Sequence, residues 1–151
     1  MDEEFSLLPT VDIPDFTEES DEYDTEYRPS LKWDIESGDF VRDGTNRIMT
    51  SDGYDAFKIW CLKAVQTERY TCAAYSDDIG VEMEDACKEL DQRAVELSIE
   101  RTIRETLEVN PRTAAVEDFE FSWNGDEVYA TFTVIAVNND GFTMEITVTA
   151  E

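Results

Sequence analysis

Five carboxylates near the middle of the chain are the residues whose types and spacing come nearest to a catalytic site. They are Glu68, Asp77, Asp78, Glu82 and Glu84. Two carboxylates that flank a glycosidic bond can hydrolyse it, one as an acid of raised pKa and the other as base or nucleophile. With 37 acidic residues in the chain, however, close carboxylates arise from composition alone. A glycosidase is therefore one hypothesis, which clearing of a peptidoglycan suspension would support.

The other common catalytic and metal-binding classes lack their residues. The sequence has no histidine, so Ser-His-Asp, Cys-His and common zinc-hydrolase sites cannot be assembled. Cys61, Cys72 and Cys87 are odd in number and lack CxxC spacing, which predicts buried, reduced thiols. The Asp-rich loops lack the ligand spacing of an EF-hand. Apart from the glycosidase hypothesis, the sequence predicts no catalytic residue, no metal and no cofactor.

The formal net charge is −25, from 37 acidic and 12 basic side chains. Nucleic acids and anionic membranes present phosphates, so this charge repels both and favours a basic partner. The same charge suits a protein that mimics DNA and inhibits a DNA-binding enzyme, which is the main alternative function. Such a mimic would compete with DNA for a nuclease or polymerase, and high salt would abolish the competition.

Residues 1–26 contain eleven acidic side chains, no basic one and two prolines. Such a segment buries too little apolar surface to offset its ordering entropy, so we expect a flexible tail. Two interpretations stay open: a solubilising tail, or a peptide that docks on a neighbour. The acidic start lacks the charge of a signal peptide and no apolar run would span a bilayer, which predicts a cytoplasmic location. Residues 27–151 are expected to form one domain.

The remaining sequence predicts an α+β fold that begins with a hairpin. Leu31, Trp33 and Ile35 alternate with polar residues before a turn at Ser37-Gly38-Asp39. Alternation that ends at a glycine turn is typical of a β-hairpin.

Two main helices are predicted by apolar residues at three- and four-residue spacing. Ser51 is the expected N-cap of the first helix, which begins at Asp52. Its buried face comprises Phe57, Trp60, Cys61, Ala64 and Val65. A short helical piece over residues 81–88 leads to a second helix from about Glu89 to Val109, whose apolar stripe starts at Leu90.

A three-stranded antiparallel meander is predicted after the second helix. Apolar residues alternate over 119–123 up to an Asn-Gly turn, a valine- and threonine-rich run follows over 128–137, and alternation resumes over 142–148. Since the third strand is the last predicted element, we expect its outer edge to be open. Open edges accept a strand from another protein.

Two short polar motifs follow the predicted helices, and each has two interpretations. Glu68 and Arg69, in Gln-Thr-Glu-Arg-Tyr at 66–70, form either a simple helix exit or a loop fixed by hydrogen bonds and an ion pair. Pro111 ends the long helix because proline cannot donate a helical hydrogen bond. Arg112 is then either an ordinary exposed base or a guanidinium that clamps carbonyls or a carboxylate.

Together these motifs resemble the XkdS-like family of contractile-tail baseplate proteins, a branch of the small acidic wedge proteins whose relatives were once labelled lysozyme-like. The resemblance covers about residues 27–151. It rests on Leu-Lys-Trp-Asp at 31–34, Gln-Thr-Glu-Arg-Tyr at 66–70, Tyr-Ser-Asp-Asp-Ile-Gly-Val-Glu-Met-Glu at 75–84, and Val-Glu-Asp-Phe-Glu-Phe at 116–121. The wider family carries Glu-Pro-Arg after its long helix, where this chain has Asn110-Pro111-Arg112.

The resemblance implies a structural, non-enzymatic protein of the baseplate wedge that connects the baseplate to the tail sheath. The implied partners are the sheath protein, larger wedge proteins and, as further candidates, tube or hub proteins. The resemblance also implies that the particle is a phage tail or a tail-like bacteriocin, assembled in the host cytoplasm. An open edge fits this role, because a sheath segment could pair with it and start polymerisation. The predicted interaction residues are Glu68, Arg69, Arg112, Phe142, Met144, Ile146 and Val148.

Overall fold

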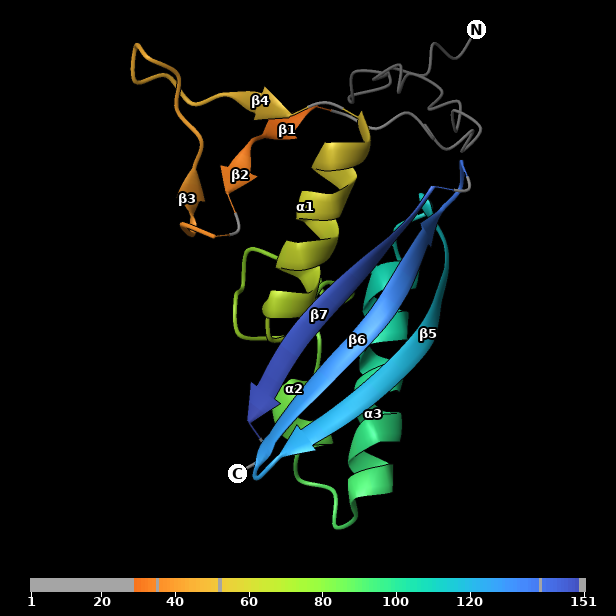
Figure 1. The fold of residues 1–151 in the computed structure, drawn as a ribbon. Coiled ribbons are helices and arrows are strands. Elements are labelled where there is room, and N and C mark those ends of the chain that lie inside the picture. Colours follow the sequence, from red (N-terminus) through yellow and green to blue (C-terminus); the bar gives the residue numbers. More distant parts are fainter. Residues whose placement is uncertain (1–28, 35, 52, 139, 150–151) are drawn as a thin grey trace, which may run out of the picture.

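The computed structural model describes residues 29–34, 36–51, 53–138 and 140–149 (Figure 1). Within them the chain forms mixed helices and strands and ends in a three-stranded antiparallel sheet, which confirms the α+β prediction. The acidic segment 1–26 lies outside the described residues. In the part that is described, no helix is long and apolar enough to cross a membrane.

The predicted N-terminal hairpin is present as two short antiparallel ladders. β1 (Ser30–Leu31) pairs with β4 (Thr50–Ser51), and β2 (Trp33–Asp34) pairs with β3 (Asp39–Phe40). The rings of Trp33 and Phe40 meet edge to face, with centroids 5.0 Å apart. Gly38 has a φ of +65° in the turn, a conformation that glycine adopts without steric cost. Figure 1 shows this hairpin as an arm beside the start of the first helix.

The first helix, α1, spans Gly53–Gln66 and buries most of its predicted face. Phe57, Cys61, Ala64 and Val65 are buried, while Trp60 is partly buried and packs against the core. The predicted N-cap is wrong: Ser51 lies in β4, and its buried hydroxyl has no hydrogen-bond partner among the described residues.

The other helices are shorter than predicted. α2 spans Met83–Ala86 and α3 spans Gln92–Glu108. Leu90 does not belong to the buried stripe, because it precedes α3 and is fully exposed. Asp91 occupies the N-cap position in an extended conformation, where aspartate is favoured over a helix interior. The buried stripe of α3 therefore begins at Val95.

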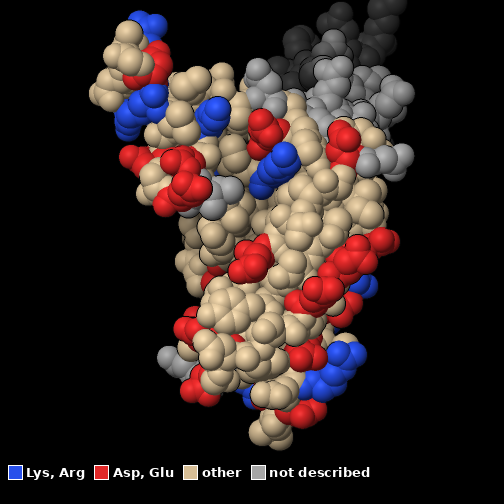
Figure 2. All heavy atoms as spheres, in the orientation of Figure 1, with Lys and Arg blue, Asp and Glu red and all other residues tan. Residues whose placement is uncertain are grey.

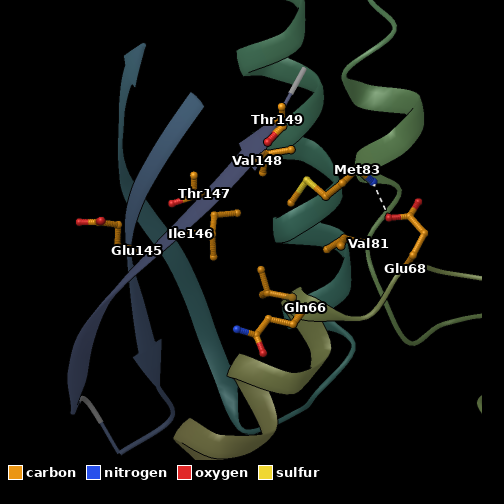
Figure 3. A pocket seen from close by; sticks show the side chains of 10 residues that line it. Gln66, Glu68, Val81, Met83, Glu145, Ile146, Thr147, Val148 and Thr149 are labelled. Carbon is orange, nitrogen blue, oxygen red and sulfur yellow. Dashed lines mark hydrogen bonds between the residues drawn. The ribbon is translucent and has the colours of Figure 1, made fainter. Parts of the chain in front are cut away.

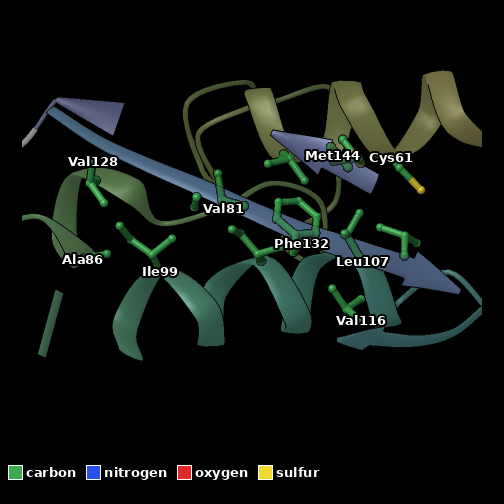
Figure 4. Close-up of a cluster of buried hydrophobic side chains, with 14 of the residues drawn as sticks. Cys61, Val81, Ala86, Ile99, Leu107, Val116, Val128, Phe132 and Met144 are labelled. Carbon is green, nitrogen blue, oxygen red and sulfur yellow. The ribbon is translucent and has the colours of Figure 1, made fainter. Parts of the chain in front are cut away.

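The sheet consists of β5 (Thr113–Asn124), β6 (Glu127–Ala136) and β7 (Gly141–Thr149), in that order. On the central strand every second side chain is buried, from Val128 to Ala136. This inner face packs on the helices around Phe132, as Figure 4 shows. On β7 the opposite face bears the exposed Thr143, Glu145 and Thr147. Figure 2 shows acidic groups spread over the visible side of the molecule.

Candidate functional site

The outer edge of β7 is the most prominent candidate site, because no described strand pairs with it. The amide of Ala136 donates to the carbonyl of Asp140, and the register continues without a shift to Glu127↔Thr149. In an antiparallel ladder, alternate residues point their N–H and C=O groups to the same neighbour. Even-numbered residues of β7 therefore bond to β6. The odd-numbered ones, Thr143, Glu145 and Thr147, direct their backbone groups outward.

A groove of about 610 Å³ runs along this edge, between β7 and the segment that joins α1 to α2. Ile146 and Val148 line it from β7, and Val81 and Met83 line it from the opposite side. Figure 3 shows these four side chains on one side of β7 and Glu145 on the other. A second hollow of about 600 Å³ shares Met83 and Val148 and continues the groove past α2. An extended segment beside β7 would thus meet both backbone groups and an apolar wall.

The opposite edge of the sheet is less suited to pairing. The register of β5 shifts between Glu117 and Glu120, and Asp118 in the bulge has a φ of +55°. All three acidic residues are exposed. Bulges and charges on an edge strand are the features that block further pairing. Of the two edges, β7 is therefore the one open to a partner.

The predicted residues of β7 divide into two pairs. The ring centroid of Phe142 lies 5.8 Å from that of Tyr54 and 6.0 Å from that of Phe57. Met144 is only 8% exposed. Both pack in the core. Ile146 and Val148 are partly buried and line the groove. The first pair thus supports the strand, and the second is positioned to contact a partner.

Arg69 lies inside the molecule, with a side chain 12% exposed. Its Nε donates to the carbonyl of Gly80 at 3.0 Å, its Nη1 contacts Glu82 at 3.1 Å, and its Nη2 donates to the Thr106 hydroxyl at 3.3 Å. Of the two interpretations from sequence, the geometry agrees with the loop fixed by an ion pair. The planar guanidinium ties the exit of α1 to α3.

Glu68 completes this loop from the groove side. Its Oε2 accepts the amide of Met83 at 3.1 Å, and its backbone forms a parallel bridge with Val81. Partial burial raises the pKa of Glu68, which the amide bonds from Met83 and Glu84 partly offset. Glu68 thus positions the groove wall and places a carboxylate at its rim.

Comparison with known proteins now identifies the family. The model of the contractile injection system sheath initiators matches residues 29–141. The chain belongs to the sheath initiator family. It is also 33% identical to the phage-like element PBSX protein XkdS of Bacillus subtilis (strain 168), over 143 residues that cover 93% of this chain and 94% of the relative. Both findings confirm the resemblance, and membership of this family points to a structural rather than an enzymatic role.

Two of the five clustered carboxylates are held by other groups of the fold. Glu68 binds a backbone amide and Glu82 pairs with Arg69, while Asp77, Asp78 and Glu84 are exposed. No group of metal-binding side chains is present among the described residues. The structure therefore gives two of the carboxylates positions in the fold and leaves the others in solvent.

The junction at residues 110–112 shows how this sheath initiator uses its asparagine. Asn110 is 8% exposed, and its Oδ1 accepts the amide of Arg112 at 3.0 Å. The carbonyls of Asn110 and Arg112 then accept the amides of Thr113 and Val137. Asn110 and the backbone of Arg112 thus link α3 to the sheet. The Arg112 side chain lines a small hollow with Trp60 and Ser30.

Sequence reasoning missed the residues that control this geometry. Thr102 accepts the amide of Glu82 at 2.7 Å, and the Thr106 hydroxyl lies within hydrogen-bonding distance of the Gly80 carbonyl. Buried threonines in an amphipathic helix are a usable signal, since buried hydroxyls need partners. Cys72 is also a correction: it is exposed and Cys87 is half-buried, so only Cys61 fits the prediction of burial.

Proposed function

We propose that this protein starts the tail sheath from the baseplate wedge by pairing the outer edge of β7 with an extended segment of a sheath subunit. The observation that carries the proposal is the row of outward backbone groups at Thr143, Glu145 and Thr147 beside the groove. Main-chain hydrogen bonds to an open edge provide affinity and fix the direction of the added strand. The bulged β5 edge supports β7 as the docking edge.

A ring of such subunits would present several edges together. Each single strand contact can be weak, because a sheath ring that binds several edges gains effective concentration from the others. In this proposal the subunit assembles in the host cytoplasm and ends in the baseplate of a phage tail or tail-like bacteriocin. Larger wedge proteins, with tube or hub proteins as further candidates, hold it there, and Arg112 stabilises the junction between α3 and the sheet.

Substitution of Thr147 tests the docking edge without removing β7. Proline at this position deletes an outward N–H and leaves the bonds to β6 intact. Particles assembled with Thr147→Pro should carry baseplates without sheath in electron micrographs. Thr147→Val keeps the N–H and should form normal sheaths. If Thr147→Pro is folded by circular dichroism and sheaths form normally, β7 is not the docking edge.

The acidic segment 1–26 is assigned to a baseplate neighbour in this proposal, because its eleven carboxylates favour a basic surface. Deletion of residues 1–26 should reduce incorporation of the subunit into baseplates. The isolated protein should still bind sheath subunits. Equal incorporation of the full and shortened chains, measured by quantitative mass spectrometry of purified particles, would instead favour the solubilising role.

A further inference from the structure

We infer that the groove beside β7 selects an extended segment that alternates aliphatic residues with lysine or arginine. Its aliphatic side chains enter the groove, and its basic side chains lie on the outer face beside Glu145. The inference rests on the proposed function and specifies the chemistry of the occupant. It follows from the pleat of β7 and from the charges around the groove.

The pleat of β7 decides which side chains of the docked segment, here called the guest, enter the groove. Neighbouring strands lie about 4.8 Å apart, and residues opposite one another project to the same face of a sheet. Guest residues beside Ile146 and Val148 therefore project to the inner face. There they meet the partly exposed Met83 across the groove, with the buried Val81 beneath it. Aliphatic residues at these positions would cover a wall that is partly exposed in the free protein.

The guest residues in between project to the outer face. That face of β7 bears the exposed side chains of Thr143, Glu145 and Thr147. A guest residue opposite Glu145 would have its side chain next to the carboxylate, where an opposite charge stabilises the pair and a like charge destabilises it. A lysine or arginine is therefore favoured at this position.

The remaining charges along the groove favour the same occupant. Glu68 lines the first hollow and Glu84 the second. Lys88 also lines the second hollow, but its Nζ contacts Asp85 at 2.7 Å. The net charge of −25 adds a long-range attraction for basic segments. An acidic strand of the same shape would be repelled from this edge.

Two peptides of equal composition test the inference on the full-length protein. One alternates lysine and valine over six residues, and the other places three lysines before three valines; both have blocked ends. The alternating peptide should bind at least about fivefold more tightly in an NMR titration of the 15N-labelled protein. It should also slow hydrogen exchange of the outward amides of Glu145 and Thr147.

Charge reversal on the two edges provides a matched pair of variants. Glu145→Lys should weaken binding of the alternating peptide by about two- to fivefold, the range for an exposed ion pair. Glu117→Lys makes the same change of net charge on the exposed face of β5 and should leave most of the affinity intact. Equal losses in both variants would show that the attraction is non-specific and would overturn the inference.

The outcomes separate this inference from the proposed function. If both peptides protect the β7 amides equally, or if the alternating peptide fails to bind while Thr147→Pro still prevents sheath growth, the selectivity is wrong and the docking edge stands. If Thr147→Pro assembles normal sheaths, the docking edge itself fails. Preference for the alternating peptide, lost in Glu145→Lys and retained in Glu117→Lys, supports the inference.

Discussion

Gly80 lies so close to the backbone of Arg69 that a side chain at position 80 would force the two segments apart. The Nε of Arg69 donates to the carbonyl of Gly80 at 3.0 Å, and a Cβ added to Gly80 would lie 3.0 Å from the Arg69 amide nitrogen and 2.8 Å from the Thr67 carbonyl oxygen. Gly80 also has a φ of +107°. This contact joins the two motifs at 66–70 and 75–84, and it sets the groove wall opposite β7.

Gly80→Ala should therefore destabilise the protein by about 3 kcal/mol or more, because backbone strain and a clash with backbone atoms add together. Urea unfolding followed by circular dichroism measures the loss. Gly44→Ala is the matched control, since a Cβ added there would meet no atom within 4 Å and the φ of Gly44 is not in the left-handed region. A loss below about 1 kcal/mol for Gly80→Ala would contradict the close approach.

Arg69→Lys tests the guanidinium separately from its charge. Lysine keeps the positive charge but cannot donate to Gly80, Glu82 and Thr106 together, because its ammonium is a point charge on a flexible stem. We expect a loss of about 1–3 kcal/mol in the free energy of unfolding. Arg101→Lys, on an exposed position of α3, should change it by less than about 0.5 kcal/mol. Equal effects of the two substitutions would exclude a clamping role.

The sequence predicted the elements whose signal is local. Alternation and glycine turns predicted the hairpin and the meander, and helical spacing predicted α1 and most of α3. Leu90 misled the prediction because its spacing extends the stripe of α3, although residues 87–91, directly before α3, are not helical. Periodicity reports which face a residue would occupy in a helix and does not report where the helix begins.

The candidate site depended on contacts that sequence spacing does not reveal. The partners of Arg69 lie 11, 13 and 37 residues further along the chain. The open edge was expected from the order of the strands. Which residues of β7 direct their backbone groups outward depends on how β7 pairs with β6 and on which of the paired residues share hydrogen bonds. The hydrogen bond from the Ala136 amide to the Asp140 carbonyl decides the second point. A register slip by one residue would have reversed the assignment.

Asn110→Ala tests the junction between α3 and the sheet. The variant leaves the amide of Arg112 without the Asn110 side-chain oxygen, which should cost about 1–2 kcal/mol. Asn110→Asp keeps an oxygen acceptor at the same distance and should retain more of the stability. Urea denaturation of the two variants makes the comparison. The interpretation fails if alanine and aspartate are equally tolerated.

The pH dependence of stability tests the environment of Glu68. Partial burial raises the pKa of Glu68 in the folded protein, despite the opposing amide bonds and with further support from the charges of Glu84 and Asp85. The folded state therefore binds this proton more tightly than the unfolded state. Its contribution to stability is present at low pH and is lost as pH rises through the raised pKa.

Glu68→Gln removes this titration and keeps an oxygen acceptor for the Met83 amide. Relative to the parent protein, the variant should gain stability as pH rises from about 4 to 7. Free energies of unfolding at several pH values give the difference curve. A flat difference over this range would show that Glu68 ionises in the folded protein as readily as in the unfolded chain, and a falling one that it ionises more readily.

The three cysteines should react with a thiol reagent in a fixed order. Burial raises the pKa of Cys61 to about 12 and makes it inaccessible. Partial burial, together with the negative charge of Glu68, raises the pKa of Cys87. Cys72 is exposed. Because the thiolate is the reactive form, we expect Cys72 to react first, Cys87 more slowly, and Cys61 only after unfolding in urea.

Two variants assign the phases of this reaction. Cys72→Ser should remove the fast phase and leave the slower ones unchanged. Glu68→Gln should accelerate the Cys87 phase, because it removes a charge that holds the pKa of this thiol up. Three fast phases in the native protein would contradict the burial of Cys61. An unchanged Cys87 rate in Glu68→Gln would show that burial alone raises the pKa of this thiol. The charge of Glu68 would then have little effect on Cys87.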